Sequence, residues 1–338
     1  MSVNQNKNIS GFLPVALAMG GNLFITAIKV VGFFISGSGA LFSEAVHSFA
    51  DTLNQSLLMV GLKRSTKKAD ENFSYGYGQE RFLWALISAC GIFFLGAGVT
   101  VYRGITSLQH PESVNITPLL FGILFTSLAI ESATFFLALK ELKKHGNGAG
   151  IAELVREGDP TTIAVLYEDG VAVLGVFVAL VSISMTYLTG SHYWDAVGSI
   201  VIGMMLGVVA ITLIAKNRSY LIGKDIPPHL RKKIIKIMES DPTIEKVLDF
   251  KSSVLDVGSY QIKCEVEFHG PALMKTFQRS KMLKAEYARV KDDYREFVKF
   301  FVEYTDRVPR LIGNRIDEIE KKIQKEVPSV KHIDIEIN

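Results

Sequence analysis

The sequence predicts an α-helical membrane protein, with a bundle of six transmembrane helices followed by a water-exposed α+β domain. Hydrophobic residues make up 48% of the 338 residues and the mean hydropathy is +0.25, values typical of a membrane protein with an aqueous part. Six segments reach the roughly 20 apolar residues that a helix needs to cross a bilayer. After Lys216 the sequence changes to charged and alternating patterns.

The six expected spans form a transmembrane domain of residues 1–216 and cover residues 11–36, 40–63, 82–106, 116–139, 161–187 and 195–215. Lysine and arginine collect after the second and fourth spans and at the exit from the sixth, whereas the first and fifth connections carry none. This asymmetry predicts that both termini face the cytoplasm. The N-terminal stretch MSVNQNKNIS has no arginine and no cleavage pattern, which favours a bacterial cytoplasmic membrane over a mitochondrial inner membrane.

Residues 217–338 are expected to form a separate cytoplasmic domain. A double proline opens an amphipathic helix, two alternating runs broken by DVGS predict a hairpin, and a second helix and a final strand, VKHIDIEI, complete an α-β-β-α-β order. A charged helical insertion covers about residues 271–306. The net charge of +3 includes no basic block, which argues against a nucleic-acid partner.

Four polar residues interrupt the second span in the stretch SEAVHSFADTLNQ: Glu44, His47, Asp51 and Asn54. Their spacings of three and four residues place them on one face of a helix. A carboxylate at the centre of a span costs at least about 2.5–3.5 kcal/mol, so this face must meet a partner, a cavity or water. The sequence therefore predicts a buried polar site along this face.

Acids on other spans can complete such a site: Glu131, Glu168, Asp169 and Asp195. Asp51 and Asp169 lie about 18 Å and about 12 Å from the cytoplasmic ends of their helices, so they can be level. A histidine and an aspartate facing acids from another helix form a mixed nitrogen and oxygen site, which suits Zn²⁺ better than Mg²⁺ or Ca²⁺. The alternative is a hydrogen-bond network without an ion, but dense intramembrane charge favours an ion or proton pathway.

Several stretches resemble the cation diffusion facilitator family, also called the family 30 zinc solute carriers. They are GSGALFSEAVHSFADTLNQ, ADENFSYGYGQERFLWALISA, DPTTIAVLYEDGVAVLGV and YWDAVGSIVIG, in the same order as in the family. LIGKDIPP, the hairpin ending in EVEF, and the charged insertion are similar to the branch that contains the animal mitochondrial zinc exporter. The resemblance covers nearly the whole chain.

The resemblance implies a homodimer in the lipid bilayer, ferredoxin-like cytoplasmic domains, and Zn²⁺ export by alternating access in exchange for protons. It assigns metal ligation to His47, Asp51 and Asp169. Val165 stands where the family usually has histidine or aspartate, so Glu168, water or Asn54 is expected to complete the shell. In the loop between spans two and three, Asp70 matches a metal ligand of some relatives, but Phe73 and Tyr77 replace the histidines, so no loop site is expected.

Other functions and residue roles stay open at this point. The transported ion could be Mn²⁺, Fe²⁺ or Co²⁺, or the chain could be a non-transporting metal sensor or scaffold. An enzyme is not expected, because the sequence contains no nucleophile and base pair and no cofactor motif. Asp195 is expected to cap its own helix, and Lys29 either pairs with an intramembrane acid or extends to the interface.

Overall fold

The structure is a computed structural model that describes residues 12–110, 114–145, 160–273 and 281–338. The chain divides into two compact units, Met1–Leu221 and Ile222–Asn338. Each unit has its own hydrophobic core, and each is described by itself. Helices of the first unit overlap each of the six apolar segments predicted from the sequence.

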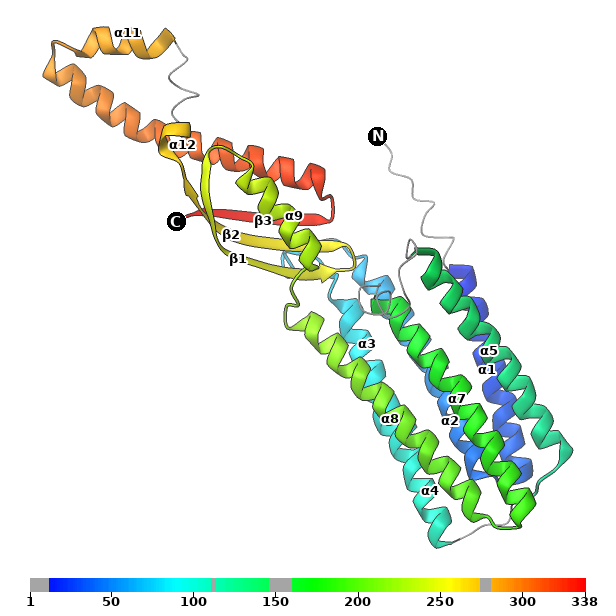
Figure 1. The fold of residues 1–338 in the computed structure, drawn as a ribbon. Helices are drawn as coiled ribbons and strands as arrows, with labels where there is room; N and C mark the ends of the chain where they lie inside the picture. Colours follow the sequence, from blue (N-terminus) through cyan, green and yellow to red (C-terminus); the bar gives the residue numbers. More distant parts are fainter. Residues whose placement is uncertain (1–11, 111–113, 146–159, 274–280) are drawn as a thin grey trace. The chain divides into compact units, whose positions relative to one another are not determined.

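The first unit is a bundle of long helices (Figure 1). Its elements are α1 (Phe12–Ser36), α2 (Gly39–Ser65), α3 (Glu80–Gly91), η2 (Ile92–Gly98), α4 (Val99–Gln109), α5 (Pro118–His145), α7 (Pro160–Thr189) and α8 (Tyr193–Leu221). The segments α3, η2 and α4 follow one another without a break, and η2 is a π-helical stretch. Small residues and aliphatic side chains from α2, α5, α7 and α8 fill the core, among them Ala40, Leu124, Ala179 and Ile202.

Four helical stretches of the described residues are long and apolar enough to cross a membrane: Glu80–Gln109, Pro118–Leu137, Leu166–Thr189 and Tyr193–Leu221. The described apolar part of α1, Gly20–Ser36, is shorter. Polar residues lower the hydropathy of α2, and that helix does not meet the same criterion. Large apolar side chains face outward along these helices, for example Phe94, Phe136 and Val208, as expected for helices surrounded by lipid.

The start of α2 is fixed by a carboxylate from α8. Asp195 accepts hydrogen bonds from the Ser38 hydroxyl at 2.5 Å and from the backbone N–H groups of Gly39 at 2.5 Å and Ala40 at 3.2 Å. The first N–H groups of a helix have no partner within it, and a negative charge there is favourable. Asp195 lies in the first turn of α8, as the sequence predicted, but its carboxylate caps α2. Local sequence spacing does not reveal such a contact between distant segments.

The second unit contains a three-stranded sheet that shares its core with two helices (Figure 1). Strands β1 (Ile244–Asp256) and β2 (Ser259–Phe268) pair antiparallel, and the predicted hairpin is confirmed. Gly258 in the turn has φ of 72°, a conformation that favours glycine. Strand β3 (Val330–Ile337) pairs parallel with β2. The helices α9 (Pro228–Glu239) and α12 (Tyr294–Glu326) contribute Ile234, Met238, Ile319 and Ile323 to one core with the sheet.

Cys264 lies in this core and is 1% exposed. Burial, together with the nearby carboxylates of Asp334 and Glu320, raises the pKa of its thiol to about 12. A thiol that stays protonated binds metal poorly, so Cys264 packs as a small apolar side chain.

The predicted helical insertion of residues 271–306 does not end at residue 306 in the structure. Helix α11 (Lys281–Val290) is followed by a short turn, and α12 then runs from Tyr294 through residue 306 to Glu326. Asp293 caps the start of α12 by accepting hydrogen bonds from the N–H groups of Arg295 and Glu296. The second half of the expected insertion and the expected second helix are therefore one helix, which contains Pro309 in its interior.

Candidate metal-binding site

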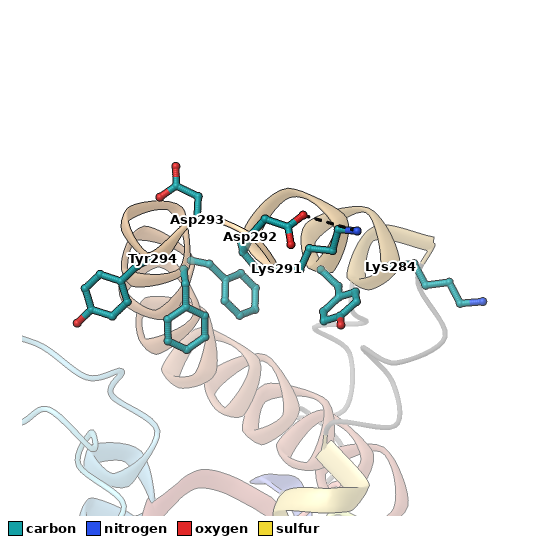
Figure 2. A pocket seen from close by; sticks show the side chains of 9 residues that line it. Lys284, Lys291, Asp292, Asp293 and Tyr294 are labelled. Carbon is teal, nitrogen blue, oxygen red and sulfur yellow. Dashed lines mark ion pairs between the residues drawn. The ribbon is translucent and has the colours of Figure 1, made fainter.

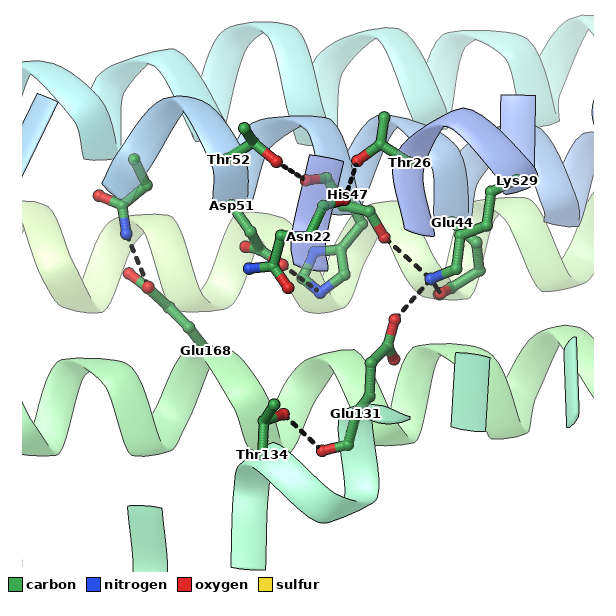
Figure 3. Close-up of polar contacts among 12 residues, drawn as sticks. Asn22, Thr26, Lys29, Glu44, His47, Asp51, Thr52, Glu131, Thr134 and Glu168 are labelled. Atoms are coloured by element: carbon green, nitrogen blue, oxygen red, sulfur yellow. Dashed lines mark hydrogen bonds and ion pairs between the residues drawn. The ribbon is translucent and has the colours of Figure 1, made fainter. Parts of the chain in front are cut away.

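The polar face of α2 points into the first unit, as its spacing predicts. Glu44 is 0% exposed, and His47 and Asn54 are each 3% exposed. The side chain of Asp51 is 16% exposed, which leaves it the most accessible of the four. Figure 3 shows Glu44, His47 and Asp51 with partners from the neighbouring helices. Because each helix turn presents one polar group, the face forms a continuous polar file through an otherwise apolar bundle.

One end of this file holds a buried lysine between two carboxylates. The Lys29 ammonium of α1 lies 2.9 Å from Glu44 Oε2, 2.6 Å from Glu131 Oε1 of α5 and 2.9 Å from the Ser48 hydroxyl (Figure 3). Lys29 itself is 0% exposed. Of the two outcomes considered for Lys29, pairing with intramembrane acids is the one observed.

His47 and Asp51 lie together at the middle of the file. His47 Nε2 is 3.5 Å from Asp51 Oδ2, a distance that permits attraction but exceeds a normal hydrogen bond. Among the described residues, neither ring nitrogen of His47 has a hydrogen-bond partner. A buried imidazole with free nitrogen atoms beside a carboxylate has the donor atoms that a transition metal prefers.

The other end of the file is a hydrogen-bonded chain across three helices. Ser88 of α3 donates to Asn54 Oδ1 at 2.7 Å, and the Asn54 amide donates to Glu168 Oε2 of α7 at 2.6 Å. Figure 3 shows Glu168 directed at this amide. Asn54 therefore orients Glu168, and the two residues that the sequence offered as alternative fourth ligands contact each other.

Asp169 lies within electrostatic range of Asp51, as does Glu168. Within the part of the chain that the structure describes, no three histidine, cysteine or acidic side chains converge in an arrangement that could hold a metal ion. The structure thus brings His47 and Asp51 together and places Glu168 and Asp169 nearby on α7, without closing the four around one point. Val165 belongs to the residues whose side chains are not described.

The sequence offered pairing of Lys29 with an intramembrane acid but did not identify Glu44 and Glu131 as its partners, although a usable signal was present. Lys29 and Glu44 lie at nearly equal chain distances from the Gly37–Ser38 turn that joins α1 and α2. Two antiparallel helices joined by a short turn place such residues at the same depth. Equal depth would have predicted the Lys29–Glu44 pair, but only the rotation of α5 reveals that Glu131 joins it.

The loop between α2 and α3 contains no histidine, and its aspartate is already engaged. Asp70 is 2.8 Å from the Lys67 ammonium and accepts a hydrogen bond from the Tyr77 hydroxyl at 2.7 Å. These hydrogen bonds lower the pKa of Asp70 to about 2. Asp70 is thus paired with a lysine and a tyrosine of its own loop.

A hollow near the tip of the α11–α12 hairpin lies outside the bundle (Figure 2). Aromatic side chains line it, including Tyr287, Tyr294 and Phe297, and an ion pair joins Lys291 and Asp292 at 3.7 Å. Solvated single ion pairs of this kind contribute little energy. The hollow has none of the buried, unpaired donor atoms seen around His47.

Comparison with known proteins connects this site to a family. Residues 15–222 match the cation efflux transmembrane domain. The chain belongs to the cation efflux family. This family is the cation diffusion facilitator family indicated by the sequence, so that resemblance is confirmed.

Two relatives match almost the whole chain of this cation efflux protein. Metal tolerance protein C4 of Arabidopsis thaliana is 35% identical over 335 residues, which cover 95% of this chain and 72% of the plant protein. The proton-coupled zinc antiporter SLC30A9, mitochondrial, of Homo sapiens is 33% identical over 330 residues, which cover 96% of this chain and 57% of the human protein. The chain thus spans little more than half the length of the human relative.

A more distant relative is the cation-efflux pump FieF of Shewanella oneidensis, which is 25% identical over 231 residues, or 68% of this chain and 73% of that protein. The relatives are transporters, and this cation efflux protein is a membrane transporter rather than an enzyme. The buried polar file of α2 lies inside the matched region.

Proposed function

We propose that this protein exports Zn²⁺ from the cytoplasm in exchange for protons. It works by alternating access as a homodimer of six-span protomers, each with a ferredoxin-like cytoplasmic domain. One observation carries the proposal: a buried imidazole without hydrogen-bond partners lies beside the Asp51 carboxylate in a transporter of the cation efflux family. Two relatives support it by name, a metal tolerance protein and a proton-coupled zinc antiporter.

The proposed ligands are His47 and Asp51 from α2 and Asp169 and Glu168 from α7. Zn²⁺ takes nitrogen and oxygen ligands in tetrahedral geometry, so two ligands from each helix would close the shell. Asp51 already lies within electrostatic range of both α7 acids, and a modest shift of α7 against α2 would bring the four together. Glu168 would exchange its hydrogen bond with Asn54 for the metal, and Asn54 would hold it between transport cycles.

Proton exchange follows from the same ligands. Imidazole nitrogen and carboxylate oxygens bind metal only when deprotonated, so protons and Zn²⁺ compete for the same atoms. When the site opens to the more acidic side, protons displace the metal. No separate proton channel is required in this scheme.

The proposed orientation places both termini in the cytoplasm, because the basic residues in the last turns of α2 and α8, such as Lys63, Arg64 and Arg218, would then face inward. The membrane is a bacterial cytoplasmic membrane or the topologically equivalent mitochondrial inner membrane. The human relative is mitochondrial by name.

The experiment is uptake of radioactive zinc into proteoliposomes that contain the full chain. Asp51→Ala and Asp169→Ala should each give folded protein with uptake reduced to the level of empty liposomes. Asp306→Ala, which changes an exposed aspartate in the second unit, is the matched control and should retain wild-type uptake. Normal uptake in Asp51→Ala or Asp169→Ala would refute the ligand assignment, and full activity in Glu168→Gln would remove Glu168 from the shell.

The carboxylate content of the site favours a second candidate cargo. Three of the four proposed ligands are carboxylates, and oxygen ligands suit Mn²⁺ as well as zinc. Competition of zinc uptake by Mn²⁺, Fe²⁺ and Co²⁺ in the same vesicles distinguishes these cargoes. Metal binding without any flux would instead support a sensor or scaffold.

A further inference from the structure

We propose that Lys29 is a resident cation of the transport pathway. Its ammonium fills a second cation-binding position, which is built by Glu44, Glu131 and Ser48 and lies next to His47 on the polar file. By filling that position, Lys29 restricts divalent cations to the site at His47 and Asp51. That the ammonium fills a cation-binding position is a claim about binding alone. That it restricts divalent cations to the other site rests on the proposed function.

The contacts of Lys29 define a cation position of three oxygen atoms. Two carboxylate oxygens, from Glu44 and Glu131, and the Ser48 hydroxyl lie 2.6–2.9 Å from the ammonium nitrogen. The three residues come from α2 and α5, and Lys29 enters from α1. Carboxylate and hydroxyl oxygens are also the ligands that hard divalent cations such as Mg²⁺, Ca²⁺ and Mn²⁺ prefer.

The position has more donor capacity than a lysine uses. Each carboxylate binds the ammonium with one oxygen, and the second oxygens, Glu44 Oε1 and Glu131 Oε2, are buried without a hydrogen-bond partner in the described part of the chain. With both carboxylates ionised, two negative charges face one positive charge. A divalent cation would balance them fully, because buried acids are costly until their charge is matched.

The acids at the other end of the polar file differ from Glu44 and Glu131 in how their charge is paired. In the described chain, no lysine or arginine forms an ion pair with Asp51, Glu168 or Asp169. Among the described side chains, the acids around Asp51 thus have no paired cation, whereas Glu44 and Glu131 share one that is covalently attached to the chain. A tethered ammonium cannot leave with the cargo, so its position does not compete with the site at Asp51.

A purely structural role is the alternative. Lys29 joins α1 to α2 and α5, and a buried ion pair that merely ties helices together would show the same distances. The two roles predict different behaviour when the charge is removed. A resident cation leaves behind a position that a free divalent ion can occupy, and a structural tie does not.

The test counts Mn²⁺ ions bound to the purified full-length protein, with Mn²⁺ alone as the probe and electron paramagnetic resonance of free Mn²⁺ as the readout. Lys29→Met should bind one more Mn²⁺ per chain than the wild type. Lys29→Arg retains the cation and should match the wild type. The double variant Lys29→Met and Glu131→Gln removes one carboxylate of the vacated position and should return to the wild-type count.

A folded Lys29→Met protein with the wild-type count would overturn the proposal. If Lys29→Met is recovered only when Mn²⁺ is present during purification, the proposal is supported, because the ion then replaces the ammonium. If it cannot be recovered at any Mn²⁺ concentration, the structural role is correct and the proposal fails.

The number of bound Mn²⁺ ions also distinguishes the role of Lys29 from the ligand role of Asp51. If Asp51→Ala binds as many ions as the wild type while Lys29→Met gains one, the assignment of Asp51 fails and that of Lys29 stands. If Asp51→Ala loses one ion and Lys29→Met gains none, the reverse holds.

Discussion

Glu44 is enclosed by two residues that leave it little freedom. Lys29 binds one carboxylate oxygen, and the other, Oε1, lies against Gly175 of α7. A methyl group at Gly175 would overlap that oxygen atom. Since Glu44 is fully buried and its ion pair fixes its position, it cannot move aside without breaking the contact with Lys29. A single glycine on α7 therefore determines how closely α7 approaches the polar file.

Gly175→Ala should destabilise the protein by about 1–3 kcal/mol, the usual cost of overpacking a filled interior. The measurement is the midpoint of thermal unfolding in detergent. Gly122→Ala is the matched control, because an added methyl group at that helical position meets no atom within 4 Å. Equal midpoints for the two variants would show that Glu44 can relocate and that the enclosure is loose.

For individual residues, the sequence predicted which way the side chains of α2 point but not which residues they contact. The spacing of Glu44, His47 and Asn54 placed them on one face, and all three are buried. Which groups meet that face depends on the rotation of α5 and α7 about their own axes. That rotation is decided by packing among many apolar residues, and no single spacing along the sequence records it.

The helix α12 is the element that departs most from the sequence-based expectation. It runs for 33 residues with Pro309 inside, although proline lacks the N–H that an interior position needs. Pro309 is exposed, so the helix can accommodate it by local adjustment. This one continuous helix contains residues of the charged insertion and also residues of the core, such as Ile319 and Ile323.

Pro309→Ala should stabilise the second unit by about 1–3 kcal/mol, because alanine restores the missing hydrogen bond and has the highest helix propensity. Pro228→Ala provides the control: Pro228 is the first residue of α9, where no N–H is needed, and its replacement should change stability by at most about 0.5 kcal/mol. Chemical unfolding followed by circular dichroism measures both. A destabilising effect of Pro309→Ala would mean that the proline fixes a bend on which the core depends.

Element types were therefore more predictable than their junctions. Alternating apolar residues predicted β1 and β2, and DVGS predicted the turn between them, because strand and turn patterns are local. The end of the insertion, the cap on α2 and the π-helical stretch η2 were not predicted, since each depends on contacts with other segments or on small shifts of backbone register.

Across the whole first unit, the charges of the polar file are arranged in sequence along α2. The cluster around Lys29, in which one ammonium faces two carboxylates, is followed by the His47–Asp51 pair and then by the acids of α7 near Asn54. Among the described residues of this file, the acids that no lysine or arginine pairs with lie in the middle and at the α7 end. That arrangement, together with the proposed exchange of metal for protons, makes transport sensitive to the pH on each side separately.

In proteoliposomes, zinc uptake should be faster when the vesicle interior is more acidic than the medium than when both have the same pH. Protons arriving from the interior displace the metal from deprotonated ligands and reset the site. An ionophore that collapses the pH difference should remove the acceleration, and Asp51→Ala should show none. Uptake that is indifferent to an imposed pH difference would contradict proton exchange.

The hydrogen bonds from the first residues of α2 to Asp195 affect how α2 and α8 can move relative to each other. Pulling the two segments apart would leave a buried carboxylate and two backbone amides without these hydrogen bonds. In the proposed transport cycle, α2 and α8 would therefore move together near this end. Relative motion of helices during transport would then occur at other helix contacts. A covalent cross-link that joins α2 to α8 beside Asp195 should leave the transport rate unchanged.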